Sequence, residues 1–312
     1  MTVDVLTLGE AMASLRTDTM LRLGGPATLS VAGAESNVAI GLARLGHRAR
    51  WVGRVGDDEL GALVLRTLRA EGVDVELAVV VPGSLTGIVL FDKAPGGGTR
   101  AHYRRGTSAA RSLCPADVAA ALRDGARIVH VTGITPMLGD LPAEAVRKTV
   151  GACHDAGATV SLDVNYRAKL ATRDHASAAL RPLLPLVDVL IASEDELPIV
   201  TDSATEDLQV KELLGHGLHE VVVKRGDRGA TVYTREECLS APALPVRMID
   251  PVGAGDAFTA GYLSGLLDAL PLRRRLARAV AVGACAVTSS GDWEGLPTRS
   301  EIEQLATGDV LR

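Results

Sequence analysis

The chain has no excess of positive charge. Its 33 Lys and Arg residues are outnumbered by 38 Asp and Glu residues, which gives a formal net charge of −5. Without a broad basic field, we expect neither nucleic acid nor an anionic membrane as a partner. No apolar run approaches the ~20 residues that cross a bilayer, and residues 1–9 predict a strand too short and too acidic for a signal peptide. We therefore expect a cytoplasmic protein.

Cysteine and aromatic residues are also scarce. The four cysteines, at positions 114, 153, 238 and 285, have neither metal-ligand nor disulfide spacing. They are expected to be small core residues in a reducing compartment. Phe, Trp and Tyr make up only 3% of the 312 residues, whereas 47% are hydrophobic. Such a chain can bury a sizeable core, and its length suits one large α/β domain.

Short β-rich runs alternate with amphipathic helical segments over most of the chain. Strands are predicted at residues 3–8, 50–55, 128–132, 159–163, 187–192, 220–224 and 230–233, and helices at 36–45, 60–71, 143–156 and 175–184. This alternation predicts an α/β fold with a doubly wound, mostly parallel sheet and helices on both faces. Ligands of such sheets bind beyond the carboxyl ends of the strands.

Two stretches interrupt the alternation. Residues 10–32 carry no helical period, and residues from about 77 to 110 look like strands and hairpins around a turn at 95–98. We expect them to form a small β-sheet lid on a single domain that spans residues 1–312. A sheet with exposed faces needs covering, so it would close over a substrate or pair with a second subunit.

Residues 250–258, Asp-Pro-Val-Gly-Ala-Gly-Asp-Ala-Phe, predict an anion-binding helix start. Glycines leave the backbone bare just before a helix, where free amides and the helix dipole attract negative charge. A carboxylate at that point, Asp256, would suit a residue that accepts a proton from a hydroxyl attacking a bound phosphoryl group. The alternative is a turn followed by a helix with Asp as its cap.

Polar side chains follow three of the predicted strands. Residues 163–167 read Asp-Val-Asn-Tyr-Arg, residues 193–196 read Ser-Glu-Asp-Glu, and residues 224–229 read Lys-Arg-Gly-Asp-Arg-Gly. Polar groups at strand ends are costly to leave unpaired, which favours a bound polar ligand. Arg167 could clamp a carboxylate or phosphate, and the acidic pair Glu194 and Glu196 could orient a hydrated Mg²⁺. Capped turns, a hairpin and a solvated helix start remain the alternatives.

Two further segments offer ligand contacts. The loop at 33–37, Gly-Ala-Glu-Ser-Asn, lets a ligand approach the backbone, and Asn37 could bind hydroxyl groups; a capped helix start explains it equally well. On the predicted strand around 102–105, alternation puts His102 and Arg104 on one face and Tyr103 and Arg105 on the other. Such charges on an edge strand can also serve only to prevent aggregation.

The 33–37 loop with Ala-Arg-Leu-Gly at 43–46, together with residues 250–256, resembles the two signatures of the ribokinase-like (PfkB) sugar kinase family. The likeness extends over nearly the whole chain. Within the family, Tyr103-Arg104, residues 163–167 and Ser193-Glu194 look most like 2-keto-3-deoxygluconate kinases. The resemblance implies ATP as donor, Mg²⁺ as cofactor with room for a monovalent cation, and transfer to the terminal 6-hydroxyl. It also implies a lid that often serves in dimerisation.

The resemblance also assigns residues to roles. The anion hole would be Gly253, Ala254 and Gly255, with Asp256 as the base. Substrate would contact Gly33, Ala34, Asn37, Tyr103, Arg104, Arg167, Asp256 and Asp292. The nucleotide would contact Asn165, Ser193, Lys224, Gly226, Asp227, Gly229, Gly253 and Gly255, and Glu196 would reach the metal through water. Three positions depart from the family pattern, namely Val89, Ser193 and Val280.

We therefore predict a phosphotransferase acting on 2-keto-3-deoxygluconate, because Arg104 and Arg167 around a neutral sugar would lack a charged partner. A fructokinase or another neutral-sugar kinase is the main alternative. A nucleoside kinase would need aromatic stacking surface in the lid, where only Phe91 and Tyr103 occur. A non-catalytic sugar sensor on the same fold is a further alternative, which the intact Asp256 and its glycines disfavour.

Overall fold

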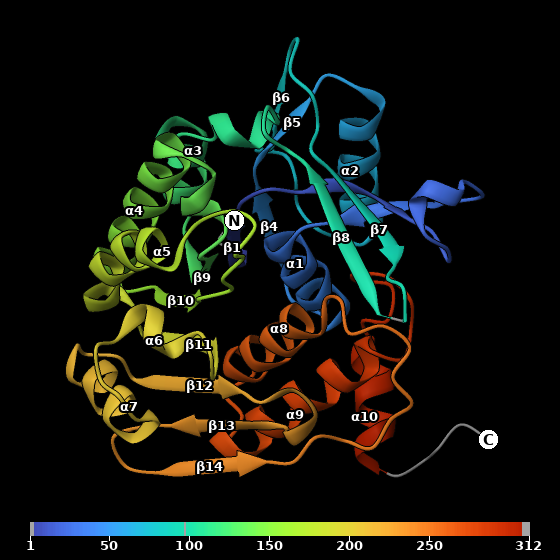
Figure 1. Cartoon of the computed structure of the whole chain (residues 1–312). Coiled ribbons are helices and arrows are strands. Elements are labelled where there is room, and N and C mark those ends of the chain that lie inside the picture. Colours follow the sequence, from blue (N-terminus) through green and yellow to red (C-terminus); the bar gives the residue numbers. More distant parts are fainter. Residues whose placement is uncertain (1–2, 97, 308–312) are drawn as a thin grey trace.

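A large sheet of eight strands forms the centre of the molecule (Figure 1). The computed structural model describes residues 3–96 and 98–307. The strand order is β14-β13-β12-β11-β10-β9-β1-β4, with β4 to β12 parallel and β13 and β14 antiparallel. These strands are β1 (Val3–Leu8), β4 (Ala49–Val52), β9 (Ala126–Thr132), β10 (Thr159–Asp163), β11 (Val189–Ser193), β12 (Glu220–Lys224), β13 (Ala230–Tyr233) and β14 (Cys238–Ala241).

Helices cover both faces of this sheet, because its strands are apolar on both sides. One face carries α3 (Pro115–Asp124), α4 (Asp140–Asp155), α5 (Arg173–Leu180), α6 (Leu197–Val200) and α7 (Glu206–Gly215). The other carries α1 (Ala34–Arg44), α8 (Ala254–Leu267) and α9 (Leu272–Ala286), flanked by α2 (Glu59–Ala70) and α10 (Arg299–Thr307). Alternate residues of one strand, such as Val129 and Ile128, therefore enter different cores. The predicted doubly wound α/β fold is confirmed.

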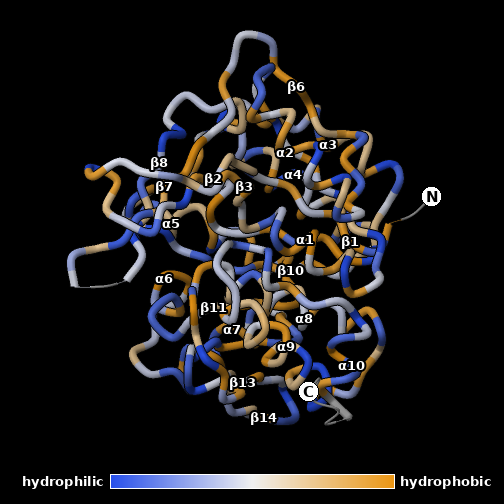
Figure 2. The backbone as a smooth tube through the Cα atoms, turned by 90° about the vertical axis from the view of Figure 1, so that its right-hand side faces the viewer, coloured by the Kyte–Doolittle hydropathy of each residue, from blue (hydrophilic) through white to orange (hydrophobic). Residues whose placement is uncertain are grey.

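Four strands form a separate sheet, called here the small sheet. They are β2 (Met12–Arg16), β3 (Thr28–Ala32), β7 (Ile88–Lys93) and β8 (Thr99–Arg104), in the order β3-β2-β7-β8. Met12, Ala32, Val89 and Phe91 form an apolar cluster on one of its faces. In Figure 2 the ends of β7 and β8 project from the side of the body. The residue at the centre of the predicted turn, Gly97, lies outside the described residues.

Two predicted elements differ from the structure for local reasons. The strand expected at 50–55 is broken at Gly53 into β4 and β5 (Arg54–Gly56), and β5 pairs with β6 (Val79–Val81) rather than continuing the large sheet. A Cβ on Gly53 would lie 2.2 Å from the Trp51 ring, so the chain turns there at a tightly packed glycine. The helix expected at 175–184 ends at Leu180, because Pro182 and Pro185 turn the next residues, Arg181–Leu186, into a 3-10 helix.

The 3-10 helix that follows β9, Thr135–Leu138, and the one that follows β12, Gly226–Arg228, stand at the carboxyl edge of the large sheet. Two others occur at Leu21–Leu23 and Ala109–Ser112. Since β1, β9, β10, β11 and β12 are parallel, the segments that leave them meet at this one edge. Among the described residues, no helix has the length and hydrophobicity needed to cross a membrane.

Candidate active site

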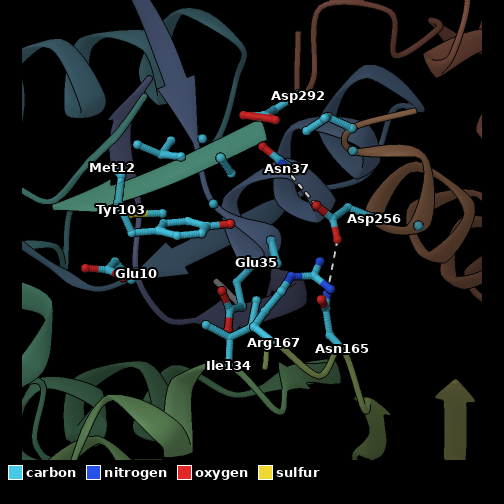
Figure 3. Close-up of a pocket in the computed structure, with 18 of the residues that line it drawn as sticks. Glu10, Met12, Glu35, Asn37, Tyr103, Ile134, Asn165, Arg167, Asp256 and Asp292 are labelled. Carbon is cyan, nitrogen blue, oxygen red and sulfur yellow. Dashed lines mark hydrogen bonds between the residues drawn. The ribbon is translucent and has the colours of Figure 1, made fainter. Parts of the chain in front are cut away.

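A cavity of about 440 Å³ lies between the carboxyl edge of the large sheet and the small sheet. Its volume suits a small molecule. Most of the predicted site residues line it (Figure 3), namely Gly33, Ala34, Asn37, Tyr103, Asn165, Arg167, Ser193, Glu196, Lys224, Gly253, Gly255, Asp256 and Asp292. The fold thus brings together segments that are up to about 260 residues apart in the chain.

The first turn of α8 forms one wall of this cavity. Gly253 caps the helix with a φ of +78°, a left-handed conformation that favours glycine. A Cβ at Gly253 would lie 1.9 Å from the carbonyl oxygen of Asp292, so the position has no room for a side chain. Within the described structure, the amides of Gly255 and Asp256 have no hydrogen-bond partner. These free amides and the helix dipole form the anion-binding helix start that the sequence predicts, which we call the anion cradle.

The Asp256 carboxylate lies in the third helical position of α8 and is held by two side-chain amides. Asn37 Nδ2 donates to its Oδ2 at 2.8 Å, and Asn165 Nδ2 donates to its Oδ1 at 3.3 Å (Figure 3). Burial raises the pKa of Asp256, and the hydrogen bond from Asn37 opposes that shift. A buried carboxylate oriented by two donors is placed to accept a proton from a bound hydroxyl group.

Asn165 reaches Asp256 through an unusual backbone conformation. It follows β10 and has a φ of +40°, which Asn tolerates better than most residues. Its backbone N–H donates to Asp163 Oδ1 at 3.1 Å, so the side chain of the last β10 residue fixes the turn. The turn aims the Asn165 amide back at α8 instead of along the strand.

Lys224, at the end of β12, brings a cation to the same wall. Its Nζ donates to Asp163 Oδ2 at 2.7 Å, and a Cβ on Gly255 would lie 3.5 Å from Nζ. Burial disfavours the ammonium form, but the neighbouring Asp163 carboxylate prevails and the pKa of Lys224 is raised. A charged lysine therefore stands beside the anion cradle at neutral pH.

Glu196 is the predicted residue that could reach a metal. Its Oε2 accepts the Ser193 N–H at 2.8 Å and its Oε1 accepts the Tyr166 N–H at 2.7 Å. Glu194 points elsewhere and pairs with Arg225 and Arg228. Among the residues that the structure describes, no group of three or more His, Cys, Asp or Glu side chains could hold a metal. Only an ion that keeps most of its own water would suit this wall.

Tyr103 of β8 and Arg105, the first residue after this strand, line the cavity, whereas Arg104 does not. Arg104 is exposed and donates to the carbonyl of Tyr103 at 3.1 Å. Arg105 is 8% exposed, pairs with Glu10 at 2.9 Å and lies over the Tyr103 ring. Side chains alternate along a strand, so two neighbours such as Tyr103 and Arg104 cannot both face the cavity.

Several acceptor oxygens in this wall are buried without a partner in the described structure. They are Glu35 Oε2, Asn37 Oδ1, Asn165 Oδ1 and Asp292 Oδ2. Buried acceptors are costly unless a donor reaches them. Burial raises the pKa of Asp292 to about 8, although the nearby Arg16 guanidinium acts to lower it. A ligand with several hydroxyl groups would satisfy such a wall.

Arg16 connects the small sheet to the segment before α8. From β2 it donates to the Asp250 carboxylate, and its second nitrogen lies 3.8 Å from Asp292. The guanidinium also stacks on the Phe91 ring at 4.4 Å. Asp250 in turn accepts the Val252 N–H at 3.2 Å, which shapes the turn into the anion cradle.

The predicted nucleotide residues Gly226, Asp227 and Gly229 do not line the cavity. They form the turn between β12 and β13, next to the cavity residue Lys224. Gly229 has a local reason to be glycine, because a Cβ would lie 2.0 Å from the carbonyl oxygen of Ala241. Ala254 lies in the first turn of α8 and is also not part of the cavity lining.

The departures from the family pattern fall in different places. Val89 lines the cavity beside Tyr103, whereas Val280 is packed in the core between α8 and α9. Three charged residues of the cavity lining, Glu10, Glu35 and Arg105, were not among the predicted site residues. The period-two alternation already placed Arg105 on the Tyr103 face, and Glu10 stands two residues after β1 at the carboxyl edge.

Comparison with known proteins agrees with this geometry. The family model described as pfkB family carbohydrate kinase matches residues 4–299. A 2-dehydro-3-deoxygluconokinase of Bacillus subtilis (strain 168) is 36% identical over 310 residues, or 97% of this chain and 95% of that protein. A fructokinase of Escherichia coli is 33% identical over 315 residues, or 97% and 99%. Among solved structures, the chain is similar to the crystal structure of a putative ribokinase II from E. coli in complex with ATP and Mg²⁺. The TM-score is 0.91 and the sequence identity is 27%, and the match covers 98% of this chain and 99% of the E. coli chain.

Proposed function

Because the chain belongs to the pfkB family of carbohydrate kinases, we propose that this cavity transfers the γ-phosphoryl group of ATP to the terminal 6-hydroxyl of 2-keto-3-deoxygluconate. This sugar acid is the 2-dehydro-3-deoxygluconate named in the B. subtilis relative. One observation carries the proposal. The buried Asp256 carboxylate stands at the free amides of α8, Arg167 lies near it, and Arg105 adds a second cation to the cavity lining.

Asp256 acts as the proton acceptor in this proposal. An aspartate of ordinary pKa, about 3.9, is too weak to deprotonate an alcohol before it reacts. It instead orients the hydroxyl group and takes the proton late, once the oxygen is bonding to phosphorus. Burial strengthens Asp256 as a proton acceptor, and the amides of Asn37 and Asn165 keep its two oxygens fixed.

The anion cradle, which is the first turn of α8, is proposed to stabilise the negative charge on the transferring phosphoryl group. The free amides of Gly255 and Asp256 would donate to its oxygens, and the charged Lys224 stands beside them. Phosphoryl transfer depends mainly on positioning and charge stabilisation, so fixed donors of this kind contribute most of what the protein supplies. The turn with Gly226, Asp227 and Gly229 is proposed to border the nucleotide beyond Lys224.

Mg²⁺ is proposed as the cofactor, in line with the ATP and Mg²⁺ complex of the ribokinase II structure. The wall fits an ion held chiefly by water and phosphate, because Glu196 has both oxygens engaged by backbone N–H groups. Glu196 would hold the ion's water shell, and the ion would neutralise phosphate charge.

The two cavity arginines favour an acidic sugar over a neutral one. Arg105 is nearly buried, and its pair with Glu10 leaves guanidinium donors beyond the single 2.9 Å bond. Arg167 is exposed and donates to the carbonyl of Tyr166, and its charge lies close enough to Asp256 to oppose the rise in the pKa of that carboxyl group. A sugar carboxylate could pair with both guanidinium groups, whereas a neutral hexose would leave the remaining donors of the buried Arg105 without an anionic partner.

The small sheet is proposed to act as a lid and as the contact of a homo-oligomer. Its edge strand β3 exposes Leu29, and the 3-10 helix Leu21–Leu23 before it exposes Leu23; these side chains are 51% and 65% accessible. Apolar groups on an edge strand favour pairing with a second copy.

The four free thiols also support the proposal of a reducing, cytoplasmic location.

A turnover panel tests the proposed function. ADP release should be measured with ketodeoxygluconate, its galactonate epimer, fructose, ribose and adenosine at equal concentrations. We expect the two sugar acids to have the highest kcat/KM. A preference for fructose would support the fructokinase alternative, and no ADP release with any of the five would refute the assignment as a kinase of these substrates.

A further inference from the structure

Glu35 occupies an unusual position in the cavity wall. It lies in the first turn of α1 and is fully buried. Its Oε1 accepts hydrogen bonds from Thr132 Oγ1 at 2.7 Å and Thr135 Oγ1 at 2.6 Å. The carboxyl group fits against Gly9, where a Cβ would lie 2.3 Å from Glu35 Cδ. The site is thus built to hold this carboxyl group in one orientation, with Oε2 left without a partner among the described residues.

Glu35 differs from the other carboxyl groups of the cavity. Each of the others has an arginine within ion-pair distance or N–H donors on both of its oxygens. They are Glu10 with Arg105, Asp292 with Arg16, Asp256 with Asn37 and Asn165, and Glu196 with two backbone amides. Glu35 has two neutral hydroxyl donors on one oxygen, and no ion pair is formed by it in the described structure.

A fully buried carboxylate without a cation is costly, and a proton removes that cost. Burial raises the pKa of Glu35 to about 7, and the nearby Asp256 carboxylate acts in the same direction. In the free enzyme at neutral pH, Glu35 is therefore divided between its two protonation states. Any anion that enters the cavity shifts it further toward the protonated state.

The other charged groups around the cavity come from several elements. Asp256 belongs to α8, Asp292 to the loop after α9, Arg167 to the turn after β10, Glu196 to the segment after β11, Lys224 to β12, Arg16 to β2, and Glu10 and Arg105 to the segments after β1 and β8. His130 of β9 is neutral because burial lowers its pKa to about 3. None of the cations forms an ion pair with Glu35 in the described structure.

We propose that Glu35 takes up a proton when the sugar acid binds, so that it is a specificity-determining residue that admits an anionic substrate. The proton comes from bulk water or buffer and forms an O–H bond on Oε2, which then acts as a donor. An ionised Glu35 would repel the incoming carboxylate. At about 6 Å and an effective dielectric constant of about 20, that repulsion corresponds to about a hundredfold in Kd. The inference rests on the proposed sugar-acid substrate.

Isothermal titration of the full-length protein with ketodeoxygluconate, in buffers of different ionisation enthalpy, measures the uptake. We expect about half a proton per sugar at pH 7, about 0.1 at pH 6 and a larger fraction at pH 8. We also expect Kd to rise about tenfold per pH unit above pH 7. The variant Glu35→Gln keeps the shape and cannot ionise. At pH 6 and pH 7 it should lose the uptake, and between pH 7 and pH 8 it should lose most of the rise in Kd, because Asp292, whose pKa is about 8, begins to titrate only there.

The outcomes separate this inference from the proposed function. Binding of ketodeoxygluconate with no proton uptake in the wild-type protein overturns the role of Glu35 and leaves the kinase assignment intact. Uptake that persists in Glu35→Gln assigns the proton to another carboxyl group and also overturns it. If neither sugar acid binds or turns over, the sugar-acid function fails, and this inference fails with it. A merely structural role for Glu35 would weaken binding equally at every pH.

Discussion

The free energy of unfolding should depend on pH through Glu35, even without substrate. Burial raises the pKa of Glu35 from 4.5 to about 7 in the folded protein. Between these values the folded state binds a proton that the unfolded state has lost, so stability falls as pH rises through this window and is constant above it. A shift of about 2.5 pKa units corresponds to about 3 kcal/mol. The loss is complete near pH 8.

The variant Glu35→Gln isolates this contribution. Other buried carboxyl groups titrate in both proteins, so the difference between the two curves reports on Glu35 alone. We expect the wild-type protein to lose about 3 kcal/mol relative to the variant between pH 4.5 and pH 8. For a chain of this length the loss corresponds to a difference of about 5 °C in Tm.

Urea unfolding at several pH values, followed by circular dichroism, measures the difference directly. The matched control is Glu59→Gln, because Glu59 is exposed in the first turn of α2. Its curve should run parallel to the wild-type curve. If the Glu35→Gln curve is also parallel to the wild type, Glu35 is not a perturbed carboxyl group, and the reasoning from its burial is refuted.

Three further outcomes are expected from the site. Asp256→Asn should lower kcat by about 10²- to 10⁴-fold while ketodeoxygluconate still binds in titration; near-normal turnover would rule out Asp256 as the proton acceptor. Arg105→Gln should raise KM for ketodeoxygluconate by about 10- to 100-fold and change KM for fructose little; the control Arg104→Gln should change neither, and equal effects of both variants would contradict the assignment of Arg105. Gly253→Ala should lower kcat and thermal stability together, because its Cβ would meet the Asp292 carbonyl oxygen; a fully active, stable variant would show that the anion cradle tolerates a different geometry.

Most of the large sheet could be predicted from the sequence, because its strands are short apolar runs separated by clear helical periods. Val3–Leu8 and Thr159–Asp163 have the predicted bounds. The break at Gly53 could not be predicted, because it depends on where the Trp51 ring packs. The helical period alone predicts a helix that continues to residue 184, whereas Pro182 and Pro185 indicate that α5 ends before them.

The candidate site was predictable wherever polar residues follow a strand. Asn165, Glu196 and Lys224 all reach the cavity because parallel strands end at one edge. In the small sheet, the alternation of side chains pointed to Tyr103 with Arg105, while the resemblance pointed to Tyr103 with Arg104, and the structure agrees with the alternation. Glu35 could not be identified from the sequence, since its isolation depends on Thr132, Thr135 and Gly9 from other elements.

The contact of Arg16 with Asp250 has a consequence for the order of events in turnover. It ties β2 of the small sheet to the turn that leads into α8. A small sheet that opens to exchange sugar must separate two charges that are largely hidden from water, and it regains their attraction on closing. Closure then restores the turn before the anion cradle in the same movement. We expect sugar exchange to be the slow and salt-dependent part of the cycle, with the cradle assembled only while the sugar is enclosed.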